Sequence, residues 1–445
     1  MNKDIFVQLL GQRQFKAVRS ILDVMNEVDI ASLLSELDDK ELALAFRLIP
    51  KDKAAEVFAN METSMQTYLV DMFSEKELKE LLDDLYMDDT VDLLEELPAN
   101  LVNRILDTVS PSDRTLINQL LNYPEDSAGS IMTTEYVDIR QSMTVAQSMA
   151  HIKETGIHKE TIYTCYVTDK RKLIGIVSAK DLMTTDDGIL ISELMETEII
   201  SVRTYTDKEE VASLFGKYDF LAVPVVDNEE RLVGIVTVDD AIDVIQDEAT
   251  EDIEMMAAIT PTDKPYMKTG VFATWKKRIP WLLLLMISAT FTGSIITSFE
   301  DALSASIVLT GFIPMLMDTG GNAGSQASVS IIRGLSLGEI EYKDIGRILW
   351  KEARVAFLCG VSLAVANFVK LLLIDRVTIP VAIVVCSTLV VTVLAAKLVG
   401  CSLPVLAKRI GFDPAVMASP FITTIVDALS LLIYFRIACA VLHIG

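Results

Sequence analysis

The sequence predicts a multidomain membrane protein with an all-α N-terminal domain, a duplicated α/β unit, a connecting helix and a five-helix transmembrane domain. Three observations lead to this fold class. Residues 1–268 carry 53 Asp and Glu against 25 Lys and Arg, whereas residues 269–445 carry 10 against 14. A nine-residue pattern in the acidic part recurs 59 residues later. After Trp275 the chain contains several apolar segments of at least the ~20 residues that a helix needs to cross a bilayer.

Composition also limits the classes of function. The 445-residue chain has a formal net charge of −24, and its acidic part argues against a nucleic-acid partner because phosphates require positive surfaces. The five cysteines form no pair with metal-ligand spacing, and the three histidines lack the spacing of a catalytic zinc site, so we do not expect an enzyme. The first ten residues lack the pattern of a secretory signal, and we therefore expect the acidic part in the cytoplasm.

Residues 1–130 have the pattern of serial short helices. Apolar residues recur at intervals of three and four, as at Leu78, Leu81 and Leu82. The sequence Ser110-Pro111 is typical of a helix start, with proline in the first turn. Short polar breaks separate the helices, at Pro50, Ser74, Pro98 and Ser110-Pro111. This pattern predicts an all-α N-terminal domain.

Residues 131–246 contain an internal repeat. The segment Leu173 to Asp181 (LIGIVSAKD) recurs as Leu232 to Asp240 (LVGIVTVDD), and each copy follows an apolar strand and a charged turn. The two copies resemble paired cystathionine-β-synthase-type (CBS) domains. By this resemblance Asp181 and Asp240 stand where such domains often bind the ribose of a nucleotide. The alternative is that each aspartate only stabilises the start of a helix.

The connecting helix and its linker, residues 247–274, follow this repeat. The chain from 241 to 268 is expected to form an acidic helix that Pro261 and Pro265 end. Asp243, Asp247 and Glu251 recur every four residues and would share one face, where like charges are destabilising. A divalent cation would neutralise such a face, whereas the alternative is a solvated acidic surface that only aids solubility.

The membrane part, residues 275–445, is expected to cross the bilayer five times. The predicted spans are about 279–298, 303–335, 353–374, 380–406 and 415–441, and the second is long enough to break near Pro314. Basic residues concentrate on one side of these spans, at 276–278, between the second and third spans, and at 408–409. This asymmetry predicts that the N-terminus is inside and the C-terminus outside. Lys397 lies deeper, and the sequence does not explain it.

The second span carries a polar stripe. Asp318, Asn322 and Gln326 are spaced by four residues and would lie on one helix face. A carboxylate inside a bilayer costs roughly 2.5–3.5 kcal/mol, so the stripe is expected to line a polar pathway. The glycines beside it, Gly320, Gly321 and Gly324, would either let helices pack closely or let this helix unwind.

The fifth span carries a second polar stretch. Thr423, Thr424 and Asp427 lie in it, with Asp427 as its only carboxylate, and Asp413 precedes it at the predicted cytoplasmic end. Carboxylate, amide and hydroxyl oxygens are ligands that suit Mg²⁺, Ca²⁺ or Mn²⁺. The two spans together predict a pathway for divalent cations.

These pieces together resemble the MgtE family of magnesium channels over nearly the whole chain. The resemblance rests on the order of the domains and on five motifs, which are Tyr123–Gly129 (YPEDSAG), Glu248–Asp252 (EATED), Pro280-Trp281, Gly320–Gln326 (GGNAGSQ) and Asp413-Pro414-Ala415 with Pro420 and Asp427. It implies a homodimer in the cell membrane with one central pore between the second and fifth spans. Asp427 would be the main pore carboxylate, with Asn322 and Asp413 in the selectivity and entrance regions.

The resemblance also implies regulatory Mg²⁺ ions on the cytoplasmic part. Their ligands would be Glu56, Asp88 and Asp92 in the N-terminal domain, Asp207, Glu209 and Asp219 in the second CBS unit, and Asp240, Asp243, Glu248 and Glu251 toward and along the connecting helix. Bound Mg²⁺ would hold a closed state, and its loss would let like charges separate and open the pore. The implied function is Mg²⁺ import that internal Mg²⁺ switches off, with ATP as a further ligand of the CBS units.

Two alternatives from other classes stay open. The first is a secondary exchanger of Mg²⁺ or another divalent cation. The second is a membrane-anchored sensor of adenine nucleotide or Mg²⁺, against which the intramembrane carboxylate argues.

Overall fold

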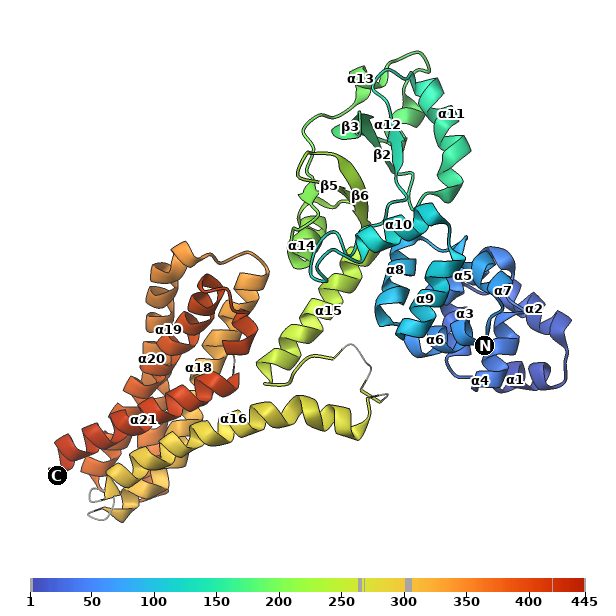
Figure 1. The fold of residues 1–445 in the computed structure, drawn as a ribbon. Coiled ribbons are helices and arrows are strands. Elements are labelled where there is room, and N and C mark those ends of the chain that lie inside the picture. Colours follow the sequence, from blue (N-terminus) through green and yellow to red (C-terminus); the bar gives the residue numbers. More distant parts are fainter. Residues whose placement is uncertain (1–2, 263–265, 268, 301–305, 418, 444–445) are drawn as a thin grey trace. The chain divides into compact units, whose positions relative to one another are not determined.

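The computed structural model describes residues 3–262, 266–267, 269–300, 306–417 and 419–443 (Figure 1). The chain divides into two compact units, Met1–Ile245 and Gln246–Gly445, which are described separately. The first unit contains a helical domain followed by two small sheets. The second contains the long apolar helices.

The N-terminal domain is all-α, as predicted. Its core is built from side chains of successive short helices, with Phe6, Leu22, Leu34 and Phe58 almost fully buried. The expected breaks at Pro50, Ser74, Pro98 and Ser110 are confirmed, because each of these residues immediately precedes a helix. The helices are α1 (Lys3–Gly11), α2 (Phe15–Val24), α3 (Glu27–Leu34), α4 (Asp39–Phe46), α5 (Lys51–Ala59), α6 (Thr63–Met72), α7 (Glu75–Leu82), α8 (Met87–Glu96), α9 (Ala99–Thr108) and α10 (Pro111–Leu120).

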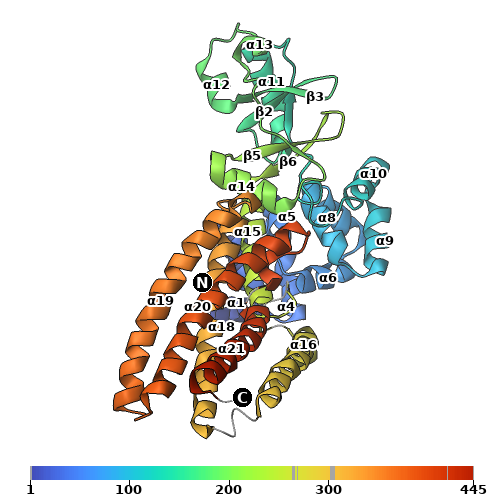
Figure 2. The same ribbon diagram turned by 90° about the vertical axis from the view of Figure 1, so that its left-hand side faces the viewer.

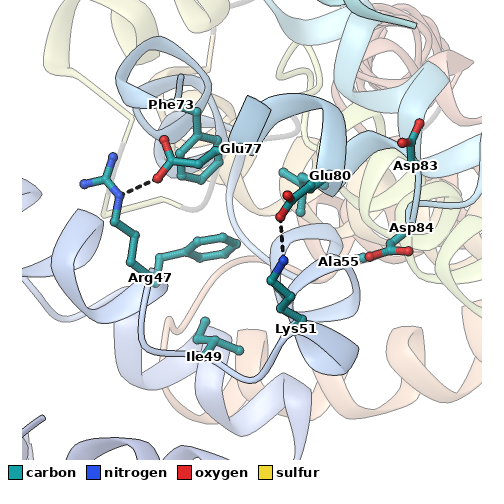
Figure 3. A pocket seen from close by; sticks show the side chains of 12 residues that line it. Arg47, Ile49, Lys51, Ala55, Phe73, Glu77, Glu80, Asp83 and Asp84 are labelled. Carbon is teal, nitrogen blue, oxygen red and sulfur yellow. Dashed lines mark hydrogen bonds and ion pairs between the residues drawn. The ribbon is translucent and has the colours of Figure 1, made fainter. Parts of the chain in front are cut away.

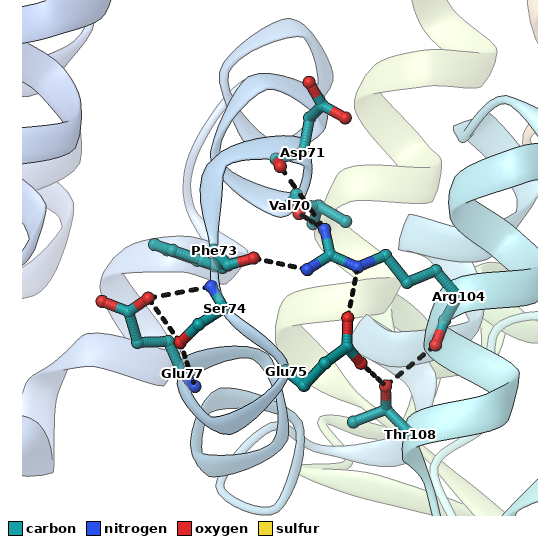
Figure 4. A network of polar contacts seen from close by, with 8 residues as sticks. All are labelled: Val70, Asp71, Phe73, Ser74, Glu75, Glu77, Arg104 and Thr108. Carbon is teal, nitrogen blue, oxygen red and sulfur yellow. Dashed lines mark hydrogen bonds and ion pairs between the residues drawn. The ribbon is translucent and has the colours of Figure 1, made fainter.

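One arginine connects three of these helices. Arg104 on α9 donates from Nε to Glu75 at 2.9 Å and from Nη1 to the carbonyl oxygen of Val70 at 2.6 Å, and it also donates to the carbonyl oxygen of Phe73 (Figure 4). The two carbonyl groups lie at the end of α6, where helix carbonyls have no partner within the helix. Arg104 therefore fixes the α6–α7 turn against α9.

The two repeats form two similar sheets, in the orders β1-β2-β3 and β4-β5-β6. In each sheet the first two strands are parallel and the last two are antiparallel. The first repeat contains β1 (Val137–Ile139), α11 (Val145–Thr155), η1 (Gly156–His158), β2 (Thr164–Asp169), β3 (Lys172–Ser178), α12 (Ala179–Thr184) and α13 (Ile191–Leu194). The second contains β4 (Val202–Arg203), α14 (Lys208–Tyr218), β5 (Ala222–Val226) and β6 (Leu232–Thr237).

The segment that precedes each repeat pairs with the other repeat. Thr133 forms a bridge with Ile235, and Ile176 forms a bridge with Glu196. The glycine in the last strand of each sheet makes this approach possible, since a Cβ on Gly234 would lie 2.7 Å from the carbonyl oxygen of Thr133. Each repeat thus pairs with the segment that precedes the other repeat, and the two repeats form a single CBS pair.

Helix α15 (Val238–Met256) begins in the second repeat and continues past residue 246. The expectation that Pro261 ends this helix is wrong, and Pro265 lies outside the described residues. The helix ends five residues before Pro261 because Ala258 adopts a left-handed conformation with φ of 54°. The N–H of Ile259 then donates to the carbonyl oxygen of Glu254 at 2.9 Å, as in a Schellman-type helix end.

The second unit is formed by long helices (Figures 1 and 2). Helix α20 packs against α18, α19 and α21. Helix α18 begins at Ile313 with Pro314 in its first turn and follows a 3₁₀ segment, which confirms the predicted break. The elements are α16 (Val271–Ser298), η2 (Ile307–Phe312), α18 (Ile313–Ser336), η3 (Tyr342–Asp344), α19 (Ile345–Leu373), α20 (Ile379–Arg409), η4 (Pro414–Met417) and α21 (Ser419–Leu442).

Four helical segments in the described residues are long and apolar enough to cross a membrane. They are Val271–Ser298, Tyr342–Leu373, Ile379–Arg409 and Pro414–Leu442. Helix α18 is not among them, since its glycine, serine, asparagine and aspartate residues interrupt its apolar sequence. The apolar helical region is therefore confirmed, whereas the count of five spans stays a prediction.

Candidate cation sites

Helix α18 has a polar face and a glycine face. Asp318, Asn322 and Gln326 lie on the polar face, as their spacing predicted, and all three are exposed in the single chain. They line a cavity of about 520 Å³ together with Ser362 of α19 and Lys397 of α20. The polar stripe therefore faces an open space rather than the core of its own chain.

The glycine face packs against α20 and α21. A Cβ on Gly320 would lie 2.8 Å from Thr392, and one on Gly324 would lie 2.7 Å from the side chain of Ile422. A Cβ on Gly400 of α20 would meet the carbonyl oxygen of Gly324. The helix remains regular through these positions. Of the two expected roles for the glycines, close packing agrees with the structure and unwinding does not.

The polar stretch of α21 lies beside α18 but does not line the same cavity. A Cβ on Gly321 would lie 3.0 Å from Thr423, which places these two residues in contact distance. Thr424 donates from Oγ1 to the carbonyl oxygen of Pro420 at 3.0 Å. Asp427 is half-buried, and its carboxylate is within electrostatic range of Asp318. The structure thus brings the two predicted stripes near each other, with a carboxylate on each.

The C-terminal half of α15 packs against the end of α18. Ser336 donates from Oγ to Asp252 Oδ2 at 3.3 Å, and Met255 and Met256 pack against Ile332. Asp413 accepts a hydrogen bond from the N–H of Ala415 at 2.7 Å. Burial and then the charge of Asp413 raise the pKa of Asp252. Asp413 was expected here, whereas Asp252 was missed as a site residue.

A group of carboxylates gathers in the first unit, where α8 meets the CBS pair. We call it the acidic junction, and its members are Glu56, Asp88, Asp89, Asp92, Glu135, Glu160, Asp239 and Asp240. The expected residues Glu56, Asp88, Asp92 and Asp240 are therefore brought together. The other four were missed, although Asp89 and Asp239 directly adjoin the expected residues Asp88 and Asp240 in the first turns of α8 and α15. Glu135 and Glu160 lie outside the helices and strands of the first repeat.

Burial and mutual repulsion disfavour the charged forms of these groups. Burial first, and then neighbouring carboxylates, raises the pKa of Asp88 well above its usual range, that of Asp89 to about 6 and that of Glu160 to about 7. Burial also raises the pKa of Asp240 to about 6, although Thr237 donates a hydrogen bond to it at 2.5 Å. Asp92 has an exposed side chain, where water screens such repulsion.

The carboxylates of the acidic junction have no basic partner among the residues that the structure describes. Among the residues that the structure describes, no salt bridge involves these carboxylates. The oxygens Asp88 Oδ1 and Glu160 Oε2 are buried, and neither has a hydrogen-bond partner among the described residues. A buried, unpartnered carboxylate oxygen is costly when it is charged, so either a proton or a cation would stabilise the junction.

The donor set of the acidic junction fits hydrated Mg²⁺. All of the donors are carboxylate oxygens, which hard divalent cations prefer. Within the described ranges no three Asp, Glu, His or Cys side chains are arranged to hold a metal ion directly. Mg²⁺ usually keeps several of its water molecules, so contacts through water satisfy this geometry. The junction would hold Mg²⁺ through Asp88, Glu160 and Asp240.

Two other expected ligands, Asp207 and Asp219, lie at opposite ends of helix α14. Asp207 caps the start of α14 by accepting from the N–H of Glu209 at 2.9 Å, whereas Asp219 lies at the other end of this helix. The helix has 11 residues and is about 16 Å long, so one ion cannot bind both carboxylates directly. Asp243, Glu248 and Glu251 lie along α15.

Asp181 and Asp240 have matching environments in the two repeats. Ser178 donates from Oγ to Asp181 Oδ2 at 2.6 Å, and Thr237 donates from Oγ1 to Asp240 Oδ2 at 2.5 Å. Each aspartate thus stands in the first turn of a helix and accepts a hydrogen bond from the residue that immediately precedes that helix. The helix-start role expected as an alternative accounts for both side chains, and a ribose site would use the same groups.

A cavity of about 440 Å³ lies in the N-terminal domain, apart from the acidic junction (Figure 3). Its polar rim contains two ion pairs, Arg47–Glu77 at 2.8 Å and Lys51–Glu80 at 2.7 Å. Arg47, by its hydrogen bond, lowers the pKa of Glu77 to about 2. These four rim charges are therefore paired, in contrast to those of the acidic junction.

Comparison with protein families agrees with this division of the chain. Residues 25–126 match the MgtE intracellular N domain, residues 128–187 and 191–247 match the CBS domain, and residues 313–437 match the MgtE divalent cation transporter model. Among solved structures, the chain is similar to the cytosolic domain of the Mg²⁺ channel MgtE in complex with ATP. The TM-score is 0.52 at 37% identity, over 55% of this chain and 100% of that one.

Curated relatives match nearly the whole length. The magnesium transporter MgtE of Thermus thermophilus is 37% identical over 97% of this chain and 96% of its own length. The magnesium transporter MgtE of Bacillus subtilis is 35% identical over 98% of this chain and 96% of its own length. With the same order of N domain, CBS pair and apolar helices, the chain belongs to the MgtE family of magnesium transporters.

Proposed function

We propose that this chain is a Mg²⁺-selective channel that imports Mg²⁺ into the cytoplasm and closes when Mg²⁺ binds its acidic cytoplasmic part. The observation that carries the proposal is the acidic junction, where buried carboxylates of the N-terminal domain and the CBS pair repel each other. Without divalent cations this repulsion favours separation of the two parts. With Mg²⁺ bound, the junction stays closed, and several ions of this kind supply the differential affinity that a switch requires.

The ion path would run along α18 and α21. Asp427 and the stripe of Asp318, Asn322 and Gln326 supply oxygen ligands, and the three stripe residues are exposed in the single chain. Polar side chains exposed to lipid are costly, so we propose that a second copy and the water of the pore cover them. Thr423, Thr424 and Asp413 would join the path at or near its cytoplasmic side, with the C-terminus outside.

Mg²⁺ flux into proteoliposomes tests this proposal. Uptake should fall as Mg²⁺ on the side of the acidic junction rises, and Asp427→Ala should reduce uptake at least tenfold at every Mg²⁺ concentration. Asp88→Asn should leave uptake intact but shift inhibition to higher Mg²⁺. Asp107→Asn is the matched control, since this aspartate is exposed and pairs with Arg114 at 3.3 Å outside the junction.

The same assay separates the rival functions. Uptake that requires an opposing gradient of another ion would replace the channel with an exchanger. A folded, inserted protein without uptake at any Mg²⁺ concentration would leave only the anchored sensor. Inhibition by Mg²⁺ that is the same in Asp88→Asn as in the wild type would refute the role of the acidic junction.

We further propose that the CBS pair binds ATP, as in the solved structure of the MgtE cytosolic domain. Asp181 is the better ribose ligand of the two candidates, because its carboxylate lies outside the acidic junction that would repel phosphates. Asp181→Asn should weaken ATP binding measured by calorimetry, whereas unchanged binding would assign the ribose to the second repeat, at Asp240.

A further inference from the structure

A charged pair lies between two helices of the membrane domain. Lys397 of α20 has only 6% of its surface exposed, and its Nζ lies 3.7 Å from Glu352 Oε2 of α19. The two side chains are 7% and 14% exposed. A buried ammonium group requires an opposite charge in a medium of low dielectric constant, so Glu352 compensates Lys397.

This pair adjoins the polar face of α18. Lys397 lines the same cavity of about 520 Å³ as Asp318, Asn322 and Gln326, whereas Glu352 does not line it. Of the two charged residues, only Lys397 therefore faces the cavity that the stripe lines, and Glu352 lies away from this cavity. An ion near Asn322 or Gln326 would experience both charges with little water between them.

We propose that the Glu352–Lys397 pair determines cation specificity by setting the electrostatic potential along the polar stripe of α18. The inference rests on the proposed ion path. Glu352 cancels a positive charge that would otherwise repel cations from the cavity. The effect of an uncompensated charge is twice as large for a divalent ion as for a monovalent ion, because the energy scales with the product of charges. The pair thus acts on Mg²⁺ more strongly than on Na⁺ or K⁺.

Opposite changes should follow from removing either charge. Glu352→Gln leaves the Lys397 ammonium uncompensated, so the Mg²⁺ concentration for half-maximal uptake should rise roughly tenfold and the Mg²⁺-to-Na⁺ flux ratio should fall. Lys397→Met keeps an unbranched side chain one atom shorter but frees the Glu352 carboxylate, so half-maximal uptake should need less Mg²⁺. The double variant should return toward the wild-type values.

Flux in proteoliposomes at fixed low Mg²⁺ on the sensor side measures these quantities, with Asp427→Ala tested in parallel. If both single variants lower the maximal flux alone and the double variant is no better, the pair has only a packing role and the inference fails. Unchanged half-maximal concentrations and flux ratios would also overturn it. Undiminished flux in Asp427→Ala would instead refute the proposed ion path.

Discussion

Asp88 carries a buried carboxylate oxygen that has no hydrogen-bond partner among the described residues, and Glu160 carries another. Such groups lower stability when they are charged, because an unsatisfied charged group loses its hydration without compensation. Both belong to the acidic junction, where the pKa of every group with a resolved shift is raised. At the scale of single residues, the unpartnered carboxylates lower the stability of the junction, and a bound cation would offset this loss.

The sign of the pH dependence follows from these shifts. Between about pH 4 and pH 7 the carboxylates of Asp89 and Glu160 bind more protons in the folded protein than in the unfolded chain, because burial and neighbouring carboxylates raise their pKa values to about 6 and 7. The free energy of unfolding without Mg²⁺ should therefore fall as the pH rises through this window. Added Mg²⁺ should stabilise the protein strongly at pH 7.5 and little at pH 5, where protons occupy the carboxylates.

Thermal unfolding of the full-length protein in detergent, followed by circular dichroism, measures this effect. Asp88→Asn should raise the midpoint at pH 7.5 in EDTA by about 2–4 °C, which corresponds to about 1 kcal/mol for a unit of this size. It should also reduce the stabilisation by Mg²⁺. Asp107→Asn should change neither quantity, and equal Mg²⁺ stabilisation at both pH values would contradict the assignment of the ligands.

At the scale of helices, α18 and α20 are held at a distance that only glycine permits. A Cβ on Gly400 would overlap the backbone of Gly324, which cannot move away as a flexible side chain can. Gly324 in turn contacts Ile422 of α21, so α18 is fixed between two helices. This packing orients the opposite face of α18, which carries Asn322, toward the cavity.

Gly400→Ala should therefore destabilise the membrane domain by about 1–3 kcal/mol, the usual cost of overpacking. The fraction of protein that stays monodisperse after heating, measured by fluorescence-detected size-exclusion chromatography, reports this change. Gly293→Ala on α16 is the matched control, since a Cβ there meets no described atom within 4 Å. Equal thermal stability of the two variants would rule out the proposed tight contact.

The elements differ in how far the sequence predicts them. The starts of α7 and α10 follow from local chemistry, because Ser74 and Ser110 each accept a hydrogen bond from the backbone N–H three residues later. The end of α15 does not, because it depends on Ala258 in a conformation that normally favours glycine. Likewise, the repeat of Leu173–Asp181 as Leu232–Asp240 could be seen in the sequence, whereas the pairing of each repeat with the segment before the other could not.

The candidate sites show the same limit. Asp318, Asn322 and Gln326 could be predicted as one stripe because a helix has a fixed period. Asp89 and Glu160 were missed, since only the fold brings α8 to the CBS pair. The partner of Lys397 was also missed, because Glu352 stands between Lys351 and Arg354, just outside the predicted third span, and nothing in the sequence singles it out.

At the scale of the whole molecule, the polar stripe of α18 is left uncovered by the part of the membrane domain that the structure describes. Asn322 is exposed, whereas Ala327 on the opposite face of the same helix is 2% exposed. In a bilayer the exposed stripe requires protein or water beside it. A second copy related by two-fold symmetry would supply both, since α18 of each copy would face a shared pore.

Cysteine cross-linking in membranes tests this assembly. In a background without the five native cysteines, Asn322→Cys should form a disulfide-linked dimer under mild oxidation, because symmetry places the two thiols across one narrow path. Ala327→Cys should remain monomeric on the same gel, because its side chain is buried within one chain. Mg²⁺ should slow the Asn322→Cys reaction by occupying the path between the thiols. Cross-linking of Ala327→Cys but not of Asn322→Cys would mean that the polar stripe faces lipid or another protein, and the proposed pore would have to be abandoned.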